Sequence, residues 1–364
     1  MPDGELQPAG VVLAGGLGRR MGGADKAMLP LLGRSLLAHA VARIGPQVAA
    51  LAVNANGDPA RPVPGLPVIG DTLPGRVGPL AGVLAAMRWA ATQDAHSVFV
   101  SPVDTPMLPD DVVKRLQRGL ARSGASIAFA RQGSQPHPAV GLWPVGMADS
   151  LEAAVVAGAR RLRDVLASNG AVPVDFDDAD AFCNVNTPAD LARADTLIRA
   201  TIAHRSTARL RLRPPAPEDR DPMIALFARP ELVAHRPDPR PDGVAASTAR
   251  LERDQAHWQA HGFGRWAIEE DGRTIGFGGL TAGQDDALSI SYHLEPEAWG
   301  RGLASELVAE AVFVAFRRLA ALGVVGMVRP GNPASRRVLE RNGFVAEGLV
   351  ELHAAPTMRL GFHV

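Results

Sequence analysis

A glycine-rich loop with basic side chains, placed directly after a short apolar segment, constrains this chain more than any other feature. Residues 10–13 are apolar and predict a short buried strand. The sequence then reads AGGLGRRMGGADK over residues 14–26. Glycines allow backbone N–H groups to approach an anion closely, and Arg19, Arg20 and Lys26 add positive charge. This combination suits a nucleoside triphosphate, whose phosphates need both hydrogen-bond donors and counter-charge.

Two common phosphate-binding motifs do not fit this loop. Gly18 and Gly23 have the spacing of a P-loop, but Ala24 stands where a P-loop places its lysine. The Rossmann dinucleotide fingerprint requires a third glycine, and Met21 occupies that position after Gly16 and Gly18. The loop therefore follows a third design.

Length and composition limit the classes of protein to which the chain can belong. Its 364 residues are long for a single core and favour two domains. A formal net charge of zero argues against a nucleic-acid footprint or a charged membrane surface. The one cysteine, Cys183, excludes disulfide stapling, and the first residues lack a secretory pattern. No apolar stretch reaches the roughly 20 residues that span a bilayer. We therefore expect a cytoplasmic protein that binds neither nucleic acid nor membrane.

The first half of the chain alternates short apolar runs with helical stretches. The apolar runs are residues 11–13, 49–53, 98–100, 127–130 and 172–176. The helical stretches are residues 35–44, 80–91, 110–122, 148–156 and 188–200. Such alternation predicts an α/β domain built on a mostly parallel sheet.

A polar stretch without periodicity separates this half from a second pattern. We expect domains at residues 8–200 and 208–364, joined by a linker at 201–207. Strands are predicted at residues 209–213, 264–269, 274–280, 287–294 and 324–328, and helices at 216–228, 245–260, 303–319 and 333–342. Strands gathered before helices predict an α+β fold for the second domain.

Three polar residues stand at or just beyond the ends of apolar runs in the first half: Asn54, Asp71 and Asp104. Open α/β sheets bind their ligands at the carboxyl ends of the strands. A lone carboxylate such as Asp104 suits Mg²⁺, which combines few protein ligands with phosphate oxygens. The segment 78–82 opens a helix, so its amides can also face a ligand. Each of these residues could instead serve as a turn or capping residue.

Taken together, these motifs resemble those of the molybdenum cofactor guanylyltransferases, within the wider nucleotidyltransferase group. The resemblance covers residues 10–200 and is carried by residues 13–26, VNAN at 53–56, GPLAG at 78–82, DTP at 104–106, HP at 137–138 and DAFCNVNTP at 180–188. It implies a Rossmann-like three-layer domain. It also implies that GTP and molybdenum–molybdopterin react to give the guanine dinucleotide cofactor and pyrophosphate.

The resemblance further implies roles for single residues. Arg20, Lys26 and Asp104 would carry catalysis, with Asp104 holding Mg²⁺. The nucleotide would contact Leu13, Ala14, Gly15, Gly16, Lys26, Asn54, Asp71 and Asp104. Asn184 and Asn186 would line the molybdopterin side. Because the choice of GTP over CTP comes from the resemblance alone, a cytidylyl or sugar-nucleotide transferase is the alternative.

In the second half, residues 295–305 link a predicted strand to a helix. Gly300 and Gly302 free the backbone at the start of that helix, where unpaired N–H groups can bind a diphosphate. Arg301 adds charge. Downstream, Asn332 is a typical N-cap, and Gly343 stands where a helix ends. A packing turn and a capped helix would explain the same residues.

The pair of segments in this order resembles the GNAT acetyltransferases, near the branch that acetylates ribosomal-protein N-termini. The resemblance covers residues 208–364 and is carried by WGRGLA at 299–304, NPAS at 332–335 and NGF at 342–344. It implies that acetyl-CoA contacts Gly300, Arg301, Gly302, Leu303, Ala304 and Asn332. The pantetheine would lie between the strands that end at Leu294 and begin at Val324.

Two departures from the GNAT pattern leave the chemistry of this half open. Trp299 stands where the wider family often has Gln or Arg, and no tyrosine lies near residues 339–340, where some members have their acid. Glu295 and Ser335 are candidates for proton transfer, which an attacking amine requires. The acceptor would be a small-molecule amine or a protein N-terminus. The alternative is a non-catalytic module that senses acetyl-CoA.

Overall fold

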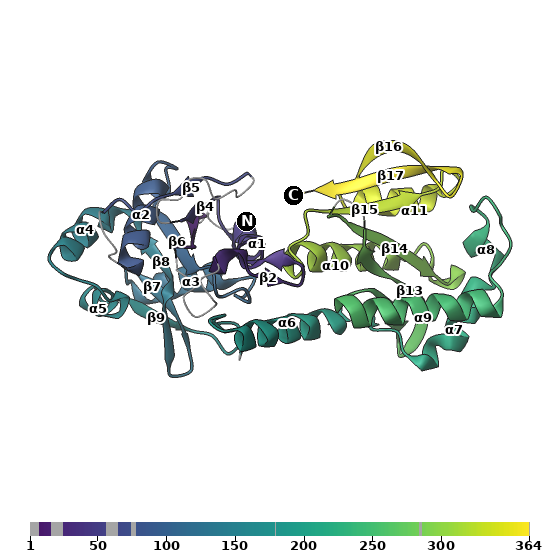
Figure 1. The fold of residues 1–364 in the computed structure, drawn as a ribbon, viewed down its shortest axis with the longest axis horizontal. Coiled ribbons are helices and arrows are strands. Elements are labelled where there is room, and N and C mark those ends of the chain that lie inside the picture. The colour runs from purple at the N-terminus through teal and green to yellow at the C-terminus, as the bar shows by residue number, and fades with distance from the viewer. Residues whose placement is uncertain are drawn as a thin grey trace. The chain divides into compact units, whose positions relative to one another are not determined.

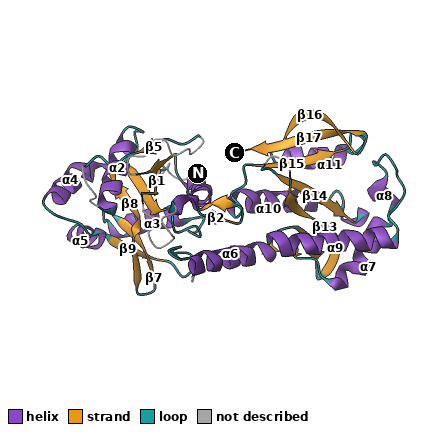
Figure 2. Cartoon of the chain, in the orientation of Figure 1, coloured by secondary structure: helices purple, strands orange, loops and turns teal. Residues whose placement is uncertain are grey.

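The computed structural model describes residues 7–15, 25–55, 65–73, 78–178, 180–283 and 286–363. Gly16 and Arg20 lie outside these ranges. The chain divides into two compact units, residues 1–195 and 196–364, and each is described here by itself (Figures 1 and 2). Within the described ranges, no helix combines the length and the apolar character needed to cross a bilayer.

The first unit is built on a seven-stranded sheet in the order β5-β4-β1-β6-β8-β7-β9. The strands are β1 (Ala9–Leu13), β4 (Ala50–Asn54), β5 (Val68–Ile69), β6 (Ser97–Pro102), β7 (Ala128–Gln132), β8 (Gln135–Pro144) and β9 (Val172–Asp175). Neighbouring strands run parallel except where β8 pairs with β6 and β7. The expected α/β class with a mostly parallel sheet is confirmed.

Helices pack against this sheet from segments that connect its strands. They are α1 (Leu36–Ile44), α2 (Pro79–Ala91), α3 (Val112–Ser123), α4 (Ala148–Val156) and α5 (Leu162–Ser168), and a short hairpin of β2 (Pro30–Leu31) and β3 (Arg34–Ser35) precedes α1. The core of this unit joins α2, α4 and α5 to alternate residues of β1 and β6, including Val11, Val98 and Val100. Burial of these strand residues positions the strand ends that carry the polar side chains.

His39 of α1 is a buried histidine that should make the first unit sensitive to acid. It is 2% exposed, and its Nε2 lies 2.7 Å from the Leu31 carbonyl oxygen, to which it donates. Burial, against that hydrogen bond, lowers the pKa of His39 from 6.5 to about 4. Between these pH values, His39 is therefore protonated in the unfolded chain and neutral in the folded unit. The contribution of neutral His39 to the free energy of unfolding should be fully present above pH 6.5 and should decline as the pH falls to about 4.

The expected loss is about 1.4 kcal/mol per pH unit over this window, or about 3 kcal/mol in all. Urea unfolding followed over this range should show it, and His39→Gln should flatten the slope. An unchanged slope in His39→Gln would mean that other groups cause the acid sensitivity.

The second unit is built on an eight-stranded sheet in the order β10-β11-β12-β13-β14-β15-β17-β16. The strands are β10 (Arg205–Ser206), β11 (Arg211–Arg213), β12 (Arg265–Glu270), β13 (Arg273–Ala282), β14 (Leu288–Leu294), β15 (Gly323–Val328), β16 (Val345–Leu352) and β17 (Ala355–His363). All neighbours are antiparallel except β14 and β15. The helices are α7 (Arg220–Phe227), α8 (Pro230–Val233), α9 (Val244–His261), α10 (Leu303–Arg317) and α11 (Pro333–Arg341).

Helices cover both faces of this sheet. Phe277 of β13 belongs to a buried cluster with residues of α7 and α9. The next residue, Gly278, faces α10, because a Cβ placed on it would lie 2.9 Å from Leu307 Cδ2. Successive strand residues face opposite sides of a sheet. Thus α10 packs on one face, and α7 and α9 pack on the other.

The residues expected to form an irregular linker, 201–207, contain regular structure instead. Helix α6 (Pro188–Ala203) continues to Ala203, and β10 follows it. Ile202 is fully buried, and its carbonyl oxygen accepts a hydrogen bond of 3.1 Å from Trp266 Nε1. The polar composition of this segment did not predict its structure, because the residue that orders it, Trp266, lies 64 residues away in the sequence.

Candidate functional site

In the first unit, three parallel strands bring their carboxyl ends to one edge of the sheet. Leu13 of β1 is in register with Asn54 of β4 and with Pro102 of β6. Two backbone bonds continue this alignment beyond the strands, from Ala14 N to the Asn54 oxygen (2.8 Å) and from Val103 N to the Leu13 oxygen (3.0 Å). The start of the glycine-rich loop therefore lies beside the segments that carry Asn54 and Asp104.

At this edge, Lys26 joins two residues that are distant in sequence. Its Nζ lies 2.6 Å from Asp104 Oδ2 and 2.7 Å from Asn186 Oδ1. The side chains of Lys26 and Asp104 are 12% and 20% exposed, so the pair is partly shielded from water. The backbone adds a further tie, since Val185 N donates to the Asp104 oxygen at 2.8 Å. Two oxygen atoms from separate segments thus converge on one cation.

Asn54 and Asp71 form a second polar pair at the same edge. Asn54 Nδ2 donates to Asp71 Oδ1 at 3.1 Å, and Ala55 N donates to the Ile69 oxygen at 3.0 Å. Gly82 of α2 lies against this pair. A Cβ on Gly82 would be 2.8 Å from Leu13 Cδ2 and 3.0 Å from Asn54 Oδ1, so a glycine is needed for this close approach.

Asp190, which belongs to none of the motifs, positions the segment that carries Asn186. Its carboxylate accepts from the backbone N–H groups of Asn186 (3.0 Å) and Thr187 (2.8 Å), and Thr187 Oγ1 accepts from Asp190 N. These hydrogen bonds hold the pKa of Asp190 below its usual range, and the bond from Asn186 N has the largest effect. The Thr-x-x-Asp spacing of residues 187–190 is that of a capping box and could have predicted this role of Asp190. Asn184 lies exposed on the same segment.

His137 of β8 also lies against the segment that follows residue 180. Its ring stacks on Phe182 with centroids 4.6 Å apart and an angle of 21°. Burial lowers the pKa of His137. Among the residues that the structure describes, no atom forms a hydrogen bond with its Nε2.

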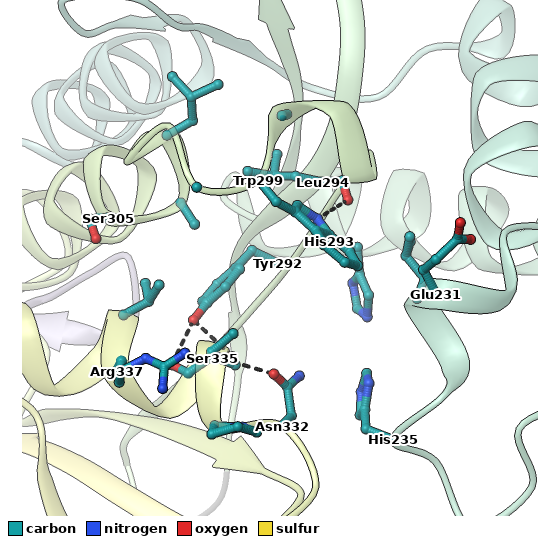
Figure 3. A pocket seen from close by; sticks show the side chains of 18 of the residues that line it. Glu231, His235, Tyr292, His293, Leu294, Trp299, Ser305, Asn332, Ser335 and Arg337 are labelled. Atoms are coloured by element: carbon teal, nitrogen blue, oxygen red, sulfur yellow. Dashed lines mark hydrogen bonds between the residues drawn. The ribbon is translucent and has the colours of Figure 1, made fainter.

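In the second unit, the central feature is a cavity where two parallel strands diverge. β14 and β15 are paired from Leu288↔Val324 to Ile290↔Gly326, and both strands continue beyond the last pair. A cavity of about 520 Å³ opens there (Figure 3). The cavity is lined by the end of β14, by α8 and the residues just beyond it, by the start of α10, and by α11 with the turn before it. Space for a ligand therefore lies beside the end of β14.

The start of α10 forms one end of the cavity. Gly302 is the N-cap with φ +81°, Gly300 has φ +72°, and no side chain caps the helix. First-turn N–H groups of a helix lack intrahelical partners, so they can bind an anion here. Four of the residues predicted to contact acetyl-CoA line the cavity, namely Gly300, Gly302, Leu303 and Ala304.

The side chain of Arg301, a residue that the GNAT resemblance predicts to contact acetyl-CoA, is turned away from the cavity. Its guanidinium pairs with the two carboxylate oxygens of Glu270 at 2.8 and 2.6 Å, and the residue is not part of the cavity wall. Glu295, a candidate for proton transfer, is likewise turned to an ion pair with Arg273 at 2.8 Å. Local charge could not predict these directions, because the competing partners come from other strands.

The start of α11 supplies polar groups to the middle of the cavity. Asn332 Oδ1 caps the helix by accepting from Ser335 N at 3.0 Å, while the amide nitrogen points into the cavity (Figure 3). The Tyr292 hydroxyl lies 2.9 Å from Ser335 Oγ, and burial raises the pKa of Tyr292 to about 12. Arg337 and Arg341 of the same helix also line the cavity, and no motif predicted either residue.

Comparison with known proteins identifies the first half. Residues 10–173 match the family of the MobA-like NTP transferase domain. A molybdenum cofactor guanylyltransferase from Cereibacter sphaeroides is 51% identical over 191 residues, which cover 52% of this chain and 96% of that protein. The chain belongs to the molybdenum cofactor guanylyltransferase family. The solved molybdopterin-guanine dinucleotide biosynthesis protein A from Archaeoglobus fulgidus is 27% identical, with a TM-score of 0.44 over 52% of this chain and 97% of that one.

This member of the guanylyltransferase family carries a second transferase domain. Residues 209–345 match the acetyltransferase (GNAT) domain family. A solved ribosomal L7/L12 alpha-N-protein acetyltransferase in complex with coenzyme A is 18% identical, with a TM-score of 0.39 over 44% of this chain and 97% of that one. The resemblance of the first half to the guanylyltransferases and of the second half to the GNAT acetyltransferases is confirmed, and the chain is a nucleotidyltransferase joined to a GNAT domain.

Proposed function

We propose that the first unit transfers GMP from GTP to the phosphate of molybdenum–molybdopterin and releases pyrophosphate. The observation that carries this proposal is the convergence of Asp104 and Asn186 on the Lys26 ammonium, at 2.6 and 2.7 Å. The guanylyltransferase relatives support the choice of GTP and of molybdopterin. Transfer brings two anions together, so positive charge at this edge of the sheet is the main requirement.

The oxygen donors at this edge fit Mg²⁺. No group of three His, Cys, Asp or Glu side chains in the described ranges is placed to hold a metal. Mg²⁺ in nucleotide sites, however, needs only one or two carboxylates together with phosphate oxygens. The Asp104 carboxylate already accepts a cation, the Lys26 ammonium. Bound Mg²⁺ would neutralise charge on the phosphates, and Asp104 is the residue that would hold it.

The remaining residues then have distinct tasks. When the nucleotide binds, Lys26 leaves its ion pair with Asp104 and pairs with the phosphates. Arg20 adds a second positive charge beside the phosphates. The backbone of residues 13–16 holds the nucleotide, and Asn54 and Asp71 contact the nucleoside. Asn184 and Asn186 line the molybdopterin side. The attacking phosphate is already ionised, so this chain needs no general base for the step.

For the second unit, we propose acetyl transfer from acetyl-CoA to an amine. The first-turn amides of α10 would bind the diphosphate, and Arg337 and Arg341 lie on the cavity wall where they can add charge. Asn332 contacts the cofactor through its amide nitrogen. Ser335, held against Tyr292, offers a hydroxyl to the departing thiolate.

Hydrogen exchange on the full chain, resolved by peptide, tests both proposals together. With Mg²⁺ and GTP we expect slower exchange at residues 25–29, 54–55, 71–73 and 103–105, because bound nucleotide orders these amides. With acetyl-CoA we expect slower exchange at residues 300–306 and 331–336. CTP at the same concentration is the matched control and should protect less. Stronger protection by CTP than by GTP would favour a cytidylyltransferase, and no acetyl-CoA protection would contradict the second proposal.

A further inference from the structure

The cavity of the second unit has an end to which the expected cofactor contacts assign no role. Its wall there is formed by Glu231 of α8, His235 just beyond α8, and His293 of β14. The two imidazole rings point toward one another across the cavity (Figure 3). His235 lies against the turn that precedes Asn332, since a Cβ on Gly331 would be 3.9 Å from His235 Cβ.

The sheet register shows that this end lies on the far side of the sheet from α10. Tyr292 is paired with Gly278, which faces α10, whereas His293 is paired with Phe277, which packs with α7 and α9. In agreement, the His293 ring lies 4.9 Å from that of Phe227 in α7. Both Tyr292 and His293 line the cavity. The cavity therefore reaches both faces of the sheet beside the end of β14, where the gap is bounded on its other side by residues 331–335, which follow β15.

This passage separates two binding regions. The first-turn amides of α10 and the hydroxyl of Ser335 lie on one side. Glu231, His235 and His293 lie on the other, where a second substrate can reach the gap without crossing the cofactor. Glu231 on the wall of this side adds negative charge, which favours a cationic group such as a protonated amine.

The surroundings keep both histidines neutral. Burial, Arg236 and Arg329 lower the pKa of His235. Burial, Arg250, Arg265, Arg236 and His235 lower the pKa of His293. Most of this positive charge is bound to carboxylates, with Arg236 and Arg250 on Asp242 and Arg265 on Asp254. A neutral imidazole has a free nitrogen lone pair that can accept a proton.

We propose that His235 is a catalytic residue that removes the proton from the incoming ammonium group, in a site framed by Glu231 and His293. This inference rests on the proposed acetyl transfer. The ammonium gives one proton to His235, and the resulting amine forms a C–N bond with the acetyl carbon. The C–S bond breaks, and the second proton lost by nitrogen goes to the thiolate, giving free CoA. The imidazolium then releases its proton to water.

The test compares the full chain with His235→Gln and His235→Ala, and with His204→Gln as a matched control at an exposed histidine of the same unit. The probes are acetyl-CoA with spermidine and with a short peptide that has a free N-terminus. We expect both His235 variants to lose about 100-fold in kcat/KM for the amine. Calorimetry should give unchanged acetyl-CoA affinity, and His204→Gln should match the parent.

The pH profile separates a proton acceptor from a structural residue. In the parent, the rate should fall as acid protonates His235. In the variants, the rate should keep rising with pH and approach that of the parent near about pH 9, where the amine loses its proton to solvent.

Each result decides the inference. A parent that binds acetyl-CoA and acetylates an amine, with His235→Gln equally active, overturns the role of His235 alone. Loss of acetyl-CoA affinity in both variants assigns His235 to the structure and also overturns it. A parent that acetylates neither probe overturns acetyl transfer and this inference together.

Discussion

Asp104→Asn should lower the rate of guanylyl transfer by about 10³-fold while leaving the first unit folded. The substitution removes the charge that would hold Mg²⁺ but keeps an oxygen within reach of the Lys26 ammonium, which now lies 2.6 Å from Asp104 Oδ2. Asn186 Oδ1, 2.7 Å from the same nitrogen, remains in place. The measurement is pyrophosphate release from GTP in the presence of molybdenum–molybdopterin and Mg²⁺.

Asp149→Asn is the matched control for this experiment. Asp149 pairs with Arg88 at 2.7 Å, but its side chain is 88% exposed and belongs to α4, outside the site. Exposed ion pairs contribute little to stability, so the control should retain both fold and activity. Unchanged pyrophosphate release in Asp104→Asn would remove Asp104 from the catalytic machinery. The same loss in both variants would point to a general effect of lowered charge.

Trp266→Ala should destabilise the second unit by about 3–5 kcal/mol. Trp266 is fully buried in β12, and its ring occupies space that Gly279 leaves open, since a Cβ on Gly279 would lie 2.6 Å from Trp266 Cε3. Its Nε1 donates to the Ile202 oxygen at the end of α6. Truncation therefore leaves a cavity and an unpaired buried carbonyl. In scanning calorimetry, the transition that acetyl-CoA raises should fall by roughly 10 °C.

Trp266→Phe separates the two contributions. It keeps most of the ring but loses the N–H donor, so we expect a smaller loss of about 1–2 kcal/mol. Hydrogen exchange at residues 200–206 should accelerate in both variants, because the end of α6 loses its partner. Equal losses in Trp266→Phe and Trp266→Ala would assign the effect to the hydrogen bond. No loss in either would contradict the idea that β12 orders the end of α6.

Several elements could be predicted because their causes are local. The apolar run at residues 98–100, the helix that follows Pro79 and the Thr187-Pro188 start of α6 each depend on neighbouring residues. β8 escaped prediction because Pro136 and Pro138 argue against a strand, although its apolar end is held between β6 and β7. β16 was missed because most of its residues are exposed, and its pairing with β17 is what orders it.

The candidate sites show the same division. Lys26, Asp104 and Asn186 were each selected from motifs, but their contact depends on the register of β1 with β6 and on the fold of residues 184–187. Arg301 was selected by its charge, and the structure turns it to Glu270. His235 and His293 carry no motif, so only their meeting in the cavity draws attention to them.

By itself, the sequence determined the two kinds of transferase domain, the position of the glycine-rich loops and the candidate residues of the two sites. These features depend on short segments, because backbone freedom, helix capping and local charge are determined by residues that are neighbours in the sequence. The tertiary structure alone decided which side chains meet, which are occupied by ion pairs, and where the cavity passes through the sheet. Those outcomes depend on strand register and on partners far away in the chain, and no local pattern encodes them.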